Sequence, residues 1–306
     1  MSDNGPYRMV ALTPEAHAGP VNAAQFDSAG NYVLTGGADK LLRLWNARDQ
    51  RLVMTLSGHG WEVLDVAISP DNTRLASCGK DRGVLMWDVS AAAMTRKITG
   101  HTERINTVAF NSNGTVVASG SYDTSVRLWD LKSNGNKPIQ ILTDAKDSVT
   151  SVTIRDHLVV SGSVDGCVRV YDLRAGSKST DSIGSPITCV ALSNDDQCML
   201  VHGTAGVPLR LLDVATGDDL NAYVGAVNGD LRLPATLDHR DALVLAGSED
   251  GRALVWDLAG DRGAGPVQSL DGHTGAVVGL ATSPVAAACV TGGADGSMRW
   301  WWGIDD

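Results

Sequence analysis

Histidine, serine or threonine, aspartate and tryptophan recur together four times along this 306-residue chain, in one order and at one spacing. The hydroxyl residue follows the histidine by 18 positions, the aspartate comes four positions later, and the tryptophan six positions after that. A serine, a histidine and an aspartate in mutual contact can perform nucleophilic catalysis, so one such set alone would indicate a hydrolase. The four sets are His17, Thr35, Asp39 and Trp45; His59, Ser77, Asp81 and Trp87; His101, Ser119, Asp123 and Trp129; and His273, Thr291, Asp295 and Trp301.

Four copies argue against catalysis, because an active site is built once in a domain whereas a structural device can recur in every repeat. We expect each set to form a buried relay of hydrogen bonds, from aspartate to histidine to hydroxyl to the indole N–H. The chain has no G-x-S-x-G, Walker or H-E-x-x-H motif, and its other histidines, His157, His202 and His239, lack metal-ligand spacing. The sequence therefore predicts no catalytic residue, no cofactor and no metal site.

The sets belong to a longer repeat of seven units. In six units an aspartate stands six residues before an aromatic residue, and the degenerate fifth unit has Gly206 and Leu212 at these positions. The seven anchor residues are 41 to 45 positions apart: Trp45, Trp87, Trp129, Tyr171, Leu212, Trp256 and Trp301. This period, with Gly-His near the start of a unit and Trp-Asp near its end, is typical of WD repeats, which form four-stranded blades. The sequence therefore predicts an all-β, seven-bladed WD-repeat β-propeller.

The third unit shows how its four strands are arranged. We expect strands at residues 105–110, 116–119, 125–129 and 138–142, with an Asn-Gly turn between the first two. Continuous apolar runs are typical of strands that are buried on both faces, as neighbouring blades require.

The two ends of the chain are expected to close the ring. The seventh unit ends after its third strand, and residues 7–12 (YRMVAL) have strand character, so we expect them to form the outer strand of blade seven. Such closure leaves no blade incomplete and limits exposed strand edges. We therefore predict a single domain, residues 1–306, in which residues 1–6 are flexible.

Composition excludes several classes of function. The net charge is −10 and no basic run exceeds two residues, so we expect no direct nucleic-acid binding. The five cysteines form no C-x-x-C pair, which favours neither a disulfide framework nor a zinc site. Residues 274–294 carry no charge, but Pro284 interrupts them, and we read them as strand, turn and strand, so no membrane association is expected.

Loops on a rigid scaffold are where partners are expected to bind. The segments that lead into blades two and three, and the turns before the repeat aspartate, carry aromatic and charged residues of the types that dominate interfaces. We expect one patch across these two blades, the blade two–three patch; Glu249 takes a similar position in blade six. The alternative is that Trp61 packs over its own blade and the charges are solvated. The patch residues are Trp61, Glu62, Lys80, Arg104 and Tyr122.

Units five and six depart from the repeat. Gly206, Leu212 and residues 225–233 (GAVNGDLRL) replace its usual features. These departures could serve a partner or be tolerated drift, and we favour drift.

Four stretches resemble the mitogen-activated protein kinase organiser family, also called the WD repeat-containing protein 83 family. Tyr171 and the Leu211-Leu212-Asp213 run are also similar to that family, whereas unit six and the final RWWWGIDD match less well. The stretches are SGHGWEVLDVAISPDNTRLASCGKDRGVLMWDV (57–89), GHTERINTVAFN (100–111), SGSVDGCVRVYDLR (161–174) and GSPITCVALSNDDQC (184–198).

The resemblance implies a non-catalytic scaffold with two described settings, the spliceosome in the nucleus and a mitogen-activated protein kinase cascade in the cytoplasm. We favour splicing, because an acidic chain fits a splicing protein that docks on proteins and not on RNA, and keep the kinase cascade as the alternative. The expected partners are splicing factors or kinase-cascade components. We expect the chain to be a monomer within a larger complex, in the nucleus and the cytoplasm.

A third interpretation comes from residues 159–174. Their ending, Tyr171-Asp172-Leu173-Arg174, resembles the box by which some WD proteins dock on the adaptor of a cullin-type ubiquitin ligase. That box normally has tryptophan at the position of Tyr171. A substrate receptor of such a ligase is therefore the lesser alternative.

Overall fold

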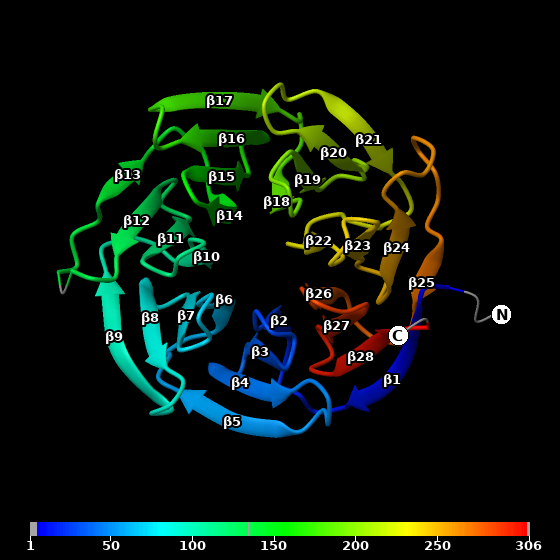
Figure 1. Cartoon of the computed structure of the whole chain (residues 1–306), viewed down its shortest axis with the longest axis horizontal. Coiled ribbons are helices and arrows are strands. Elements are labelled where there is room, and N and C mark those ends of the chain that lie inside the picture. The colour runs from blue at the N-terminus through cyan, green and yellow to red at the C-terminus, as the bar shows by residue number, and fades with distance from the viewer. Residues whose placement is uncertain (1–4, 134, 305–306) are drawn as a thin grey trace.

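The computed structural model describes residues 5–133 and 135–304, which form 28 strands and no helix. The strands make seven four-stranded antiparallel sheets arranged around a central axis (Figure 1). The predicted all-β, seven-bladed propeller is confirmed.

The blades follow one another in chain order. Blade one has β2 (Val21–Phe26), β3 (Tyr32–Gly37), β4 (Leu41–Asn46) and β5 (Leu52–Ser57); blade two has β6 (Val63–Ile68), β7 (Arg74–Gly79), β8 (Gly83–Asp88) and β9 (Ala93–Thr99). Blade three has β10 (Ile105–Phe110), β11 (Val116–Ser121), β12 (Val126–Asp130) and β13 (Gln140–Leu142); blade four has β14 (Val149–Arg155), β15 (Leu158–Ser163), β16 (Cys167–Asp172) and β17 (Ser177–Ser182). Blade five has β18 (Ile187–Leu192), β19 (Cys198–Gly203), β20 (Leu209–Asp213) and β21 (Asp219–Tyr223); blade six has β22 (Ala235–Leu237), β23 (Leu243–Gly247), β24 (Ala253–Asp257) and β25 (Gln268–Leu270). Blade seven has β26 (Val277–Thr282), β27 (Ala288–Gly293), β28 (Met298–Gly303) and β1 (Tyr7–Thr13).

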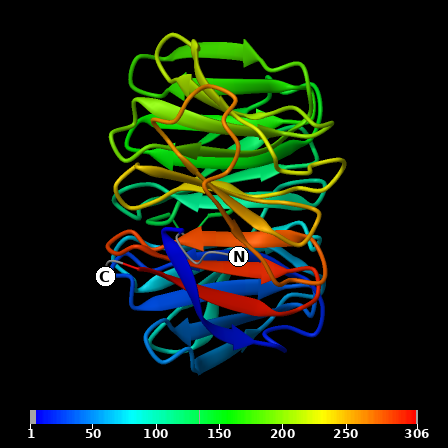
Figure 2. The same ribbon diagram turned by 90° about the vertical axis from the view of Figure 1, so that its right-hand side faces the viewer.

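Closure of the ring joins the two ends of the chain. The first strand, β1, pairs antiparallel with β28, from Tyr7 opposite Gly303 to Thr13 opposite Met298 (Figure 2). The Pro6 carbonyl accepts a hydrogen bond from the Ile304 N–H at 3.1 Å. Residues 1–4, part of the segment expected to be flexible, lie outside the described residues. The N-terminal strand therefore completes blade seven, as expected.

The core lies between neighbouring blades. Strand β15 (LVVSGS) is buried on both faces, whereas the outer strand β17 (SKSTDS) is almost fully exposed, which matches their apolar and polar compositions. Val160, Val168 and Ile187 belong to one apolar cluster that spans blades four and five. Each blade thus buries its face against the next, which explains the continuous apolar runs.

The predicted strands of blade three are largely confirmed. The first has the expected bounds, and the second extends to Ser121. The third runs from Val126 to Asp130, and the fourth begins only at Gln140, although the Ile139 N–H already donates to the Leu128 carbonyl of β12 at 2.8 Å. Residues 274–294 contain β26 and β27 joined by a turn. Among the described residues, no helix is long and apolar enough to cross a membrane.

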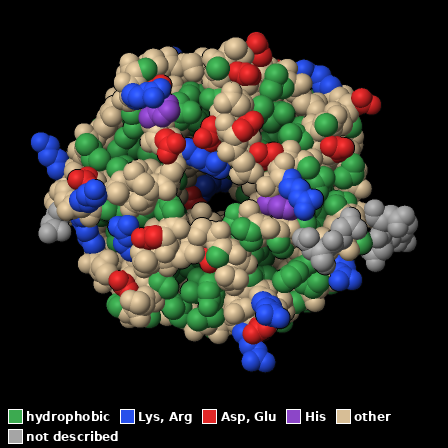
Figure 3. Space-filling model, viewed as in Figure 1, with side chains coloured by type: hydrophobic (Ala, Val, Ile, Leu, Met, Phe, Trp, Pro, Cys, Tyr) green, Lys and Arg blue, Asp and Glu red, His purple; other side chains and the backbone are tan. Residues whose placement is uncertain are grey.

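A central channel runs along the axis, where the innermost strands of the blades face one another. It encloses a cavity of about 710 Å³. Figure 3 shows the channel opening at the centre of one face, with charged side chains gathered around its mouth. Basic side-chain atoms are visible inside it, and the basic residues that line it are Arg155 and Arg232.

Candidate protein-docking face

The four predicted sets of side chains are each in hydrogen-bond contact. In blade three, His101 Nδ1 lies 2.8 Å from Asp123 Oδ2 and His101 Nε2 lies 2.8 Å from Ser119 Oγ. The indole N–H of Trp129 donates to the same Ser119 Oγ at 2.8 Å. Blades one and two repeat this geometry with distances of 2.7 to 2.9 Å. Blade seven is looser, with 3.3 Å between His273 Nδ1 and Asp295 Oδ1.

The direction of these hydrogen bonds follows from the indole, which can only donate. Because Trp129 donates to Ser119 Oγ, the serine hydroxyl is free to donate to His101 Nε2, and the Nδ1–H then donates to Asp123. This is the proton arrangement of a catalytic triad. The hydroxyl is nevertheless completely buried, as it is in blades one, two and seven, and the indole occupies one side of it. A substrate has no access to it, so the arrangement fits a structural relay.

The packing of the relays also shifts the pKa values of their histidine and aspartate side chains. Burial lowers the pKa of His17 and of His273, which keeps their imidazoles neutral. Burial alone would raise the pKa of Asp123, but hydrogen bonds from His101 and Ser125 outweigh it and hold that pKa well below its usual range. In blades one and seven the relay therefore consists of a neutral histidine held by a charged aspartate.

Blade four has no histidine in its relay and uses an arginine. Arg169 is 3% exposed, and its guanidinium binds both carboxylate oxygens of Asp165, at 2.6 and 3.2 Å. The N–H of Lys146, in the segment leading into this blade, also donates to Asp165 at 2.8 Å. The aspartate thus fixes the same turn with a different partner.

In blades five and six, hydrogen bonds to residues 224–234, here called the blade-six loop, replace the relay. Ala246 stands where other blades have the hydroxyl, and the indole N–H of Trp256 donates to the Val224 carbonyl at 3.0 Å. Asn228 reaches blade five, where its amide donates to the Gly203 carbonyl at 2.9 Å and lies 3.4 Å from His202 Nε2. The loop that we read as drift therefore satisfies buried polar groups in two blades.

Arg232 of the blade-six loop crosses the channel. Its guanidinium donates to the Asn106 carbonyl of blade three at 2.6 Å and to the Leu64 carbonyl of blade two at 3.3 Å. It also lies 3.5 Å from the Asp65 carboxylate. The channel lining comprises the innermost strands, the turns that follow them and, in blade six, residues 232–234, which lead into β22. Because Leu64 and Asn106 lie near the starts of β6 and β10, Arg232 lies at the end of the channel where the innermost strands begin.

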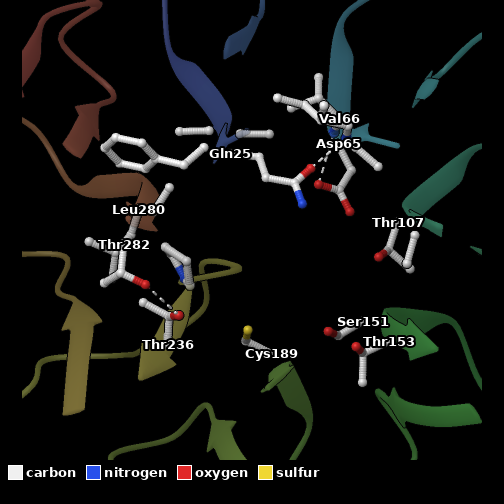
Figure 4. Close-up of a pocket in the computed structure, with 18 of the residues that line it drawn as sticks. Gln25, Asp65, Val66, Thr107, Ser151, Thr153, Cys189, Thr236, Leu280 and Thr282 are labelled. Carbon is white, nitrogen blue, oxygen red and sulfur yellow. Dashed lines mark hydrogen bonds between the residues drawn. The ribbon is translucent and has the colours of Figure 1, made fainter. Parts of the chain in front are cut away.

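Along the channel wall, polar side chains of one blade form hydrogen bonds with the backbone of the next blade. Asp65 accepts a hydrogen bond from the Val108 N–H at 3.1 Å, Thr107 from Val152 at 3.3 Å, and Ser151 from Val190 at 3.0 Å. Figure 4 shows Asp65, Thr107 and Ser151 pointing into the channel from the innermost strands. These polar side chains therefore hold neighbouring blades together.

The segments that lead into the innermost strands and the turns that contain Asp39, Asp81, Asp123 and Asp295 lie at one end of the blades, here called the relay face. Val63 pairs with Gly79 and Ile105 with Ser121, so each such segment meets its turn at this end. Four of the predicted patch residues pair here: the Lys80 ammonium lies 2.7 Å from the Glu62 carboxylate, and the Arg104 guanidinium lies 4.6 Å from the centre of the Tyr122 ring.

The aromatic side chains of the patch project into solvent. Trp61 is 61% exposed and Tyr122 is 49% exposed. The Trp61 ring also contacts the neighbouring blade. The ammonium of Lys40, in blade one, lies over the ring at 5.8 Å from its centre. The sequence analysis did not identify Lys40. Lys40 directly follows the relay aspartate of its blade, as Arg82 does in blade two, and this shared position could have identified it.

Glu249 lies elsewhere on the ring. It belongs to blade six, and its carboxylate accepts hydrogen bonds from the backbone N–H groups of Asp230 and Leu231 at 2.9 and 2.8 Å. These bonds lower the pKa of Glu249. The structure therefore joins Glu249 to the blade-six loop and separates it from the blade two–three patch.

Cysteines and metal-ligating side chains are two further groups that could carry chemistry. All five cysteines, Cys78, Cys167, Cys189, Cys198 and Cys289, are unpaired. Within residues 5–133 and 135–304, no three histidine, cysteine, aspartate or glutamate side chains gather as a metal site would require.

Comparison with known proteins assigns the family. The WD domain, G-beta repeat family matches residues 10–46, 50–88, 93–130, 136–172 and 264–301. WD repeat domain-containing protein 83 of Mus musculus is 49% identical over 296 residues, which cover 94% of this chain and 90% of that protein. The Homo sapiens protein of the same name is 55% identical over 268 residues, covering 85% of each chain. The chain belongs to the WD repeat domain-containing protein 83 family.

WD-repeat propellers are typically non-catalytic scaffolds that mediate protein–protein interactions, which agrees with the buried relay hydroxyls. The unmatched residues 173–263 contain blade five and the first three strands of blade six, where the blade-six loop replaces the relay. The Danio rerio member of this family is 58% identical over 246 residues, which cover 80% of this chain and 78% of that protein.

Proposed function

We propose that this chain is a non-catalytic scaffold that docks partner proteins on the relay face of blades two and three, within complexes that process pre-mRNA. The observation that carries the docking site is the pair of exposed aromatic rings, Trp61 and Tyr122, each held beside a cation on a rigid ring. Large amphipathic rings with little freedom to lose on binding are the residues that contribute most to interfaces.

The burial of the relay hydroxyls supports a scaffold that does not catalyse a reaction. In each relay the hydroxyl that resembles a nucleophile is completely buried beneath its tryptophan, as Ser119 is beneath Trp129. A relay that fixes turns at the end of a blade stabilises the loops that a partner contacts. The relays therefore support docking without taking part in it.

The splicing setting rests on the family resemblance and on charge. A chain of net charge −10 does not favour contact with RNA phosphates, so within a ribonucleoprotein it would bind proteins. We propose that it acts in the nucleus, that it is also present in the cytoplasm, and that it is a monomer within a larger complex.

Purification from the chain's own cells tests the proposal. A tag placed before Tyr7 keeps the relay face free, and mass spectrometry identifies the proteins that copurify. We expect splicing factors with the native chain, and their loss with a triple variant carrying Trp61→Ala, Arg104→Ala and Tyr122→Ala.

Other outcomes would reassign the function. Recovery of kinase-cascade components alone would replace the splicing setting by signalling. Recovery of cullin-ligase subunits, lost on Arg174→Ala, would favour the substrate-receptor role; Arg174 is exposed and follows β16 at the end opposite the relay face. Splicing factors retained by the triple variant would place the docking site elsewhere on the ring.

A further inference from the structure

The relay face of blades one to three carries cations that no carboxylate neutralises. Lys80 is paired with Glu62, but no ion pair within the described residues involves Lys40, Arg82 or Arg104. Lys40 and Arg104 rest on aromatic rings, and the Arg82 guanidinium donates to the Thr102 carbonyl at 3.3 Å. These three side chains therefore keep most of their capacity to bind an anion.

The contacts make this surface continuous across three blades. Lys40 of blade one lies over Trp61 of blade two, and Arg82 of blade two contacts Thr102 of blade three. Arg104 and Tyr122 complete it on blade three. We call this surface, Lys40, Trp61, Arg82, Arg104 and Tyr122, the cationic–aromatic strip.

The strip differs from the rest of the molecule in charge. The whole chain has a net charge of −10, whereas the strip has three cations; beside it lie the exposed Glu103 and Glu62, which is paired with Lys80. Two of the nearby relay aspartates lie beside an arginine, Asp39 at 2.9 Å from Arg43 and Asp123 at 3.8 Å from Arg127, whereas Asp81 contacts the His59 ring at 2.8 Å. On the far side of the same face, blade six presents Asp230 and Glu249. The relay face is thus cationic at one side and acidic at the other.

We propose that the cationic–aromatic strip binds an acidic segment, rich in aspartate and glutamate, of a partner protein. Its carboxylates would bind Lys40, Arg82 and Arg104, while its backbone and apolar side chains would lie on Trp61 and Tyr122. Arginine binds carboxylates in a planar, bidentate geometry, and exposed charge complementarity speeds association and selects the partner. This inference rests on the proposed docking function and specifies the chemistry of its partner.

Synthetic peptides test the chemistry directly on the full chain. The probes are two fluorescein-labelled 12-residue peptides of the same sequence, one with six glutamates and the other with glutamine at those positions, followed by fluorescence anisotropy. We expect the glutamate peptide to bind at least about tenfold more tightly, with a Kd that weakens as salt is added.

Charge variants of the protein locate the site. The triple variant K40E/R82E/R104E should lose at least about tenfold in affinity for the glutamate peptide. The matched control K132E/K137E/R174E changes the net charge equally, but its residues follow β12 and β16 at the opposite end of the blades, and it should keep native affinity. The neutral variant K40Q/R82Q/R104Q provides the same test if the charge reversal impairs folding.

The proposal is overturned if both peptides bind equally, or if the control loses as much affinity as the strip variant. It is also overturned if the natural partners, lost from the Trp61, Arg104 and Tyr122 variant, are retained by a K40Q/R82Q variant. That last result would leave the docking function intact and remove only the acidic chemistry.

Discussion

At the residue scale, the four relays turn a catalytic set of side chains into a structural one. The difference lies in access: the hydroxyls of Ser77 and Ser119 are completely buried and accept an indole N–H, which leaves them no route to a substrate. Residue types and spacing predicted these contacts, because one repeat position always occupies one place in a blade.

Replacing a relay histidine is expected to destabilise the fold. His101→Ala removes one hydrogen-bond partner each from Asp123 and Ser119 and leaves part of their hydrogen-bonding capacity unmet in the interior, at a cost of about 1–3 kcal/mol in the free energy of unfolding. Urea unfolding measures the change. His157→Ala is the control, since that histidine is partly exposed and outside every relay. Equal stability of the two variants would contradict the structural role.

A buried histidine in blade five makes stability depend on pH. Burial lowers the pKa of His202 to about 4, whereas in the unfolded chain it titrates near 6.5. Between these values the unfolded state binds more protons, so stability falls as the pH decreases through this range. We expect acidification from pH 7 to pH 5 to cost about 2 kcal/mol through this residue.

Urea unfolding of the native chain and of His202→Gln at both pH values tests this expectation. Glutamine keeps a polar side chain but does not titrate, so the pH dependence should become smaller. It should not vanish, because burial also lowers the pKa of His17 and His273. An unchanged pH dependence in the variant would assign the acid sensitivity to other groups.

At the element scale, the blade-six loop supplies what the degenerate repeats lack. Val224 satisfies the Trp256 indole, Asn228 bonds to blade five, and Arg232 reaches blades two and three. The strands were predictable because their pattern recurs in every unit. The loop contacts were not, because each occurs once and Arg232 joins residues 126 and 168 positions away in the chain.

Removing the cross-channel contact is expected to loosen the loop more than the ring. Arg232→Ala leaves the Leu64 and Asn106 carbonyls to water in the channel, so we expect a loss of about 1 kcal/mol in the free energy of unfolding. Hydrogen exchange should quicken at the amides of Asp230 and Leu231. Arg240→Ala, an exposed arginine of the same blade, is the control. Unchanged exchange at these amides would show that Arg232 does not hold the loop.

At the scale of the whole molecule, the stability of the ring depends on β1, which supplies the last strand of blade seven. Deleting residues 1–13 would expose the edge of β28, an unpaired row of backbone groups that favours association between chains. We expect a lower melting temperature and growth of aggregates, measured by light scattering. Deletion of residues 1–4 leaves β1 whole and is the control. A shortened chain that stays monomeric and equally stable would contradict the closure argument.

The docking patch shows how far sequence could reach at this scale. The repeat register placed Trp61, Arg104 and Tyr122 on one face, and the structure brings them there. The repeat register did not reveal that Lys40 lies over Trp61, because that contact joins two blades and depends on how closely they pack. Glu249 occupies the same repeat position as Lys80 and Tyr122, but it lies in blade six and therefore outside the blade two–three patch.

Cross-linking the purified complex with a lysine-reactive reagent, followed by mass spectrometry, tests the docking claim most directly. Lysines mark both ends of the blades: Lys40 and Lys80 lie on the relay face, and Lys132 and Lys137 lie in the connection that follows β12 at the opposite end. Docking on the relay face predicts that partner proteins cross-link to Lys40 and Lys80. Partner cross-links confined to Lys132 and Lys137 would contradict it.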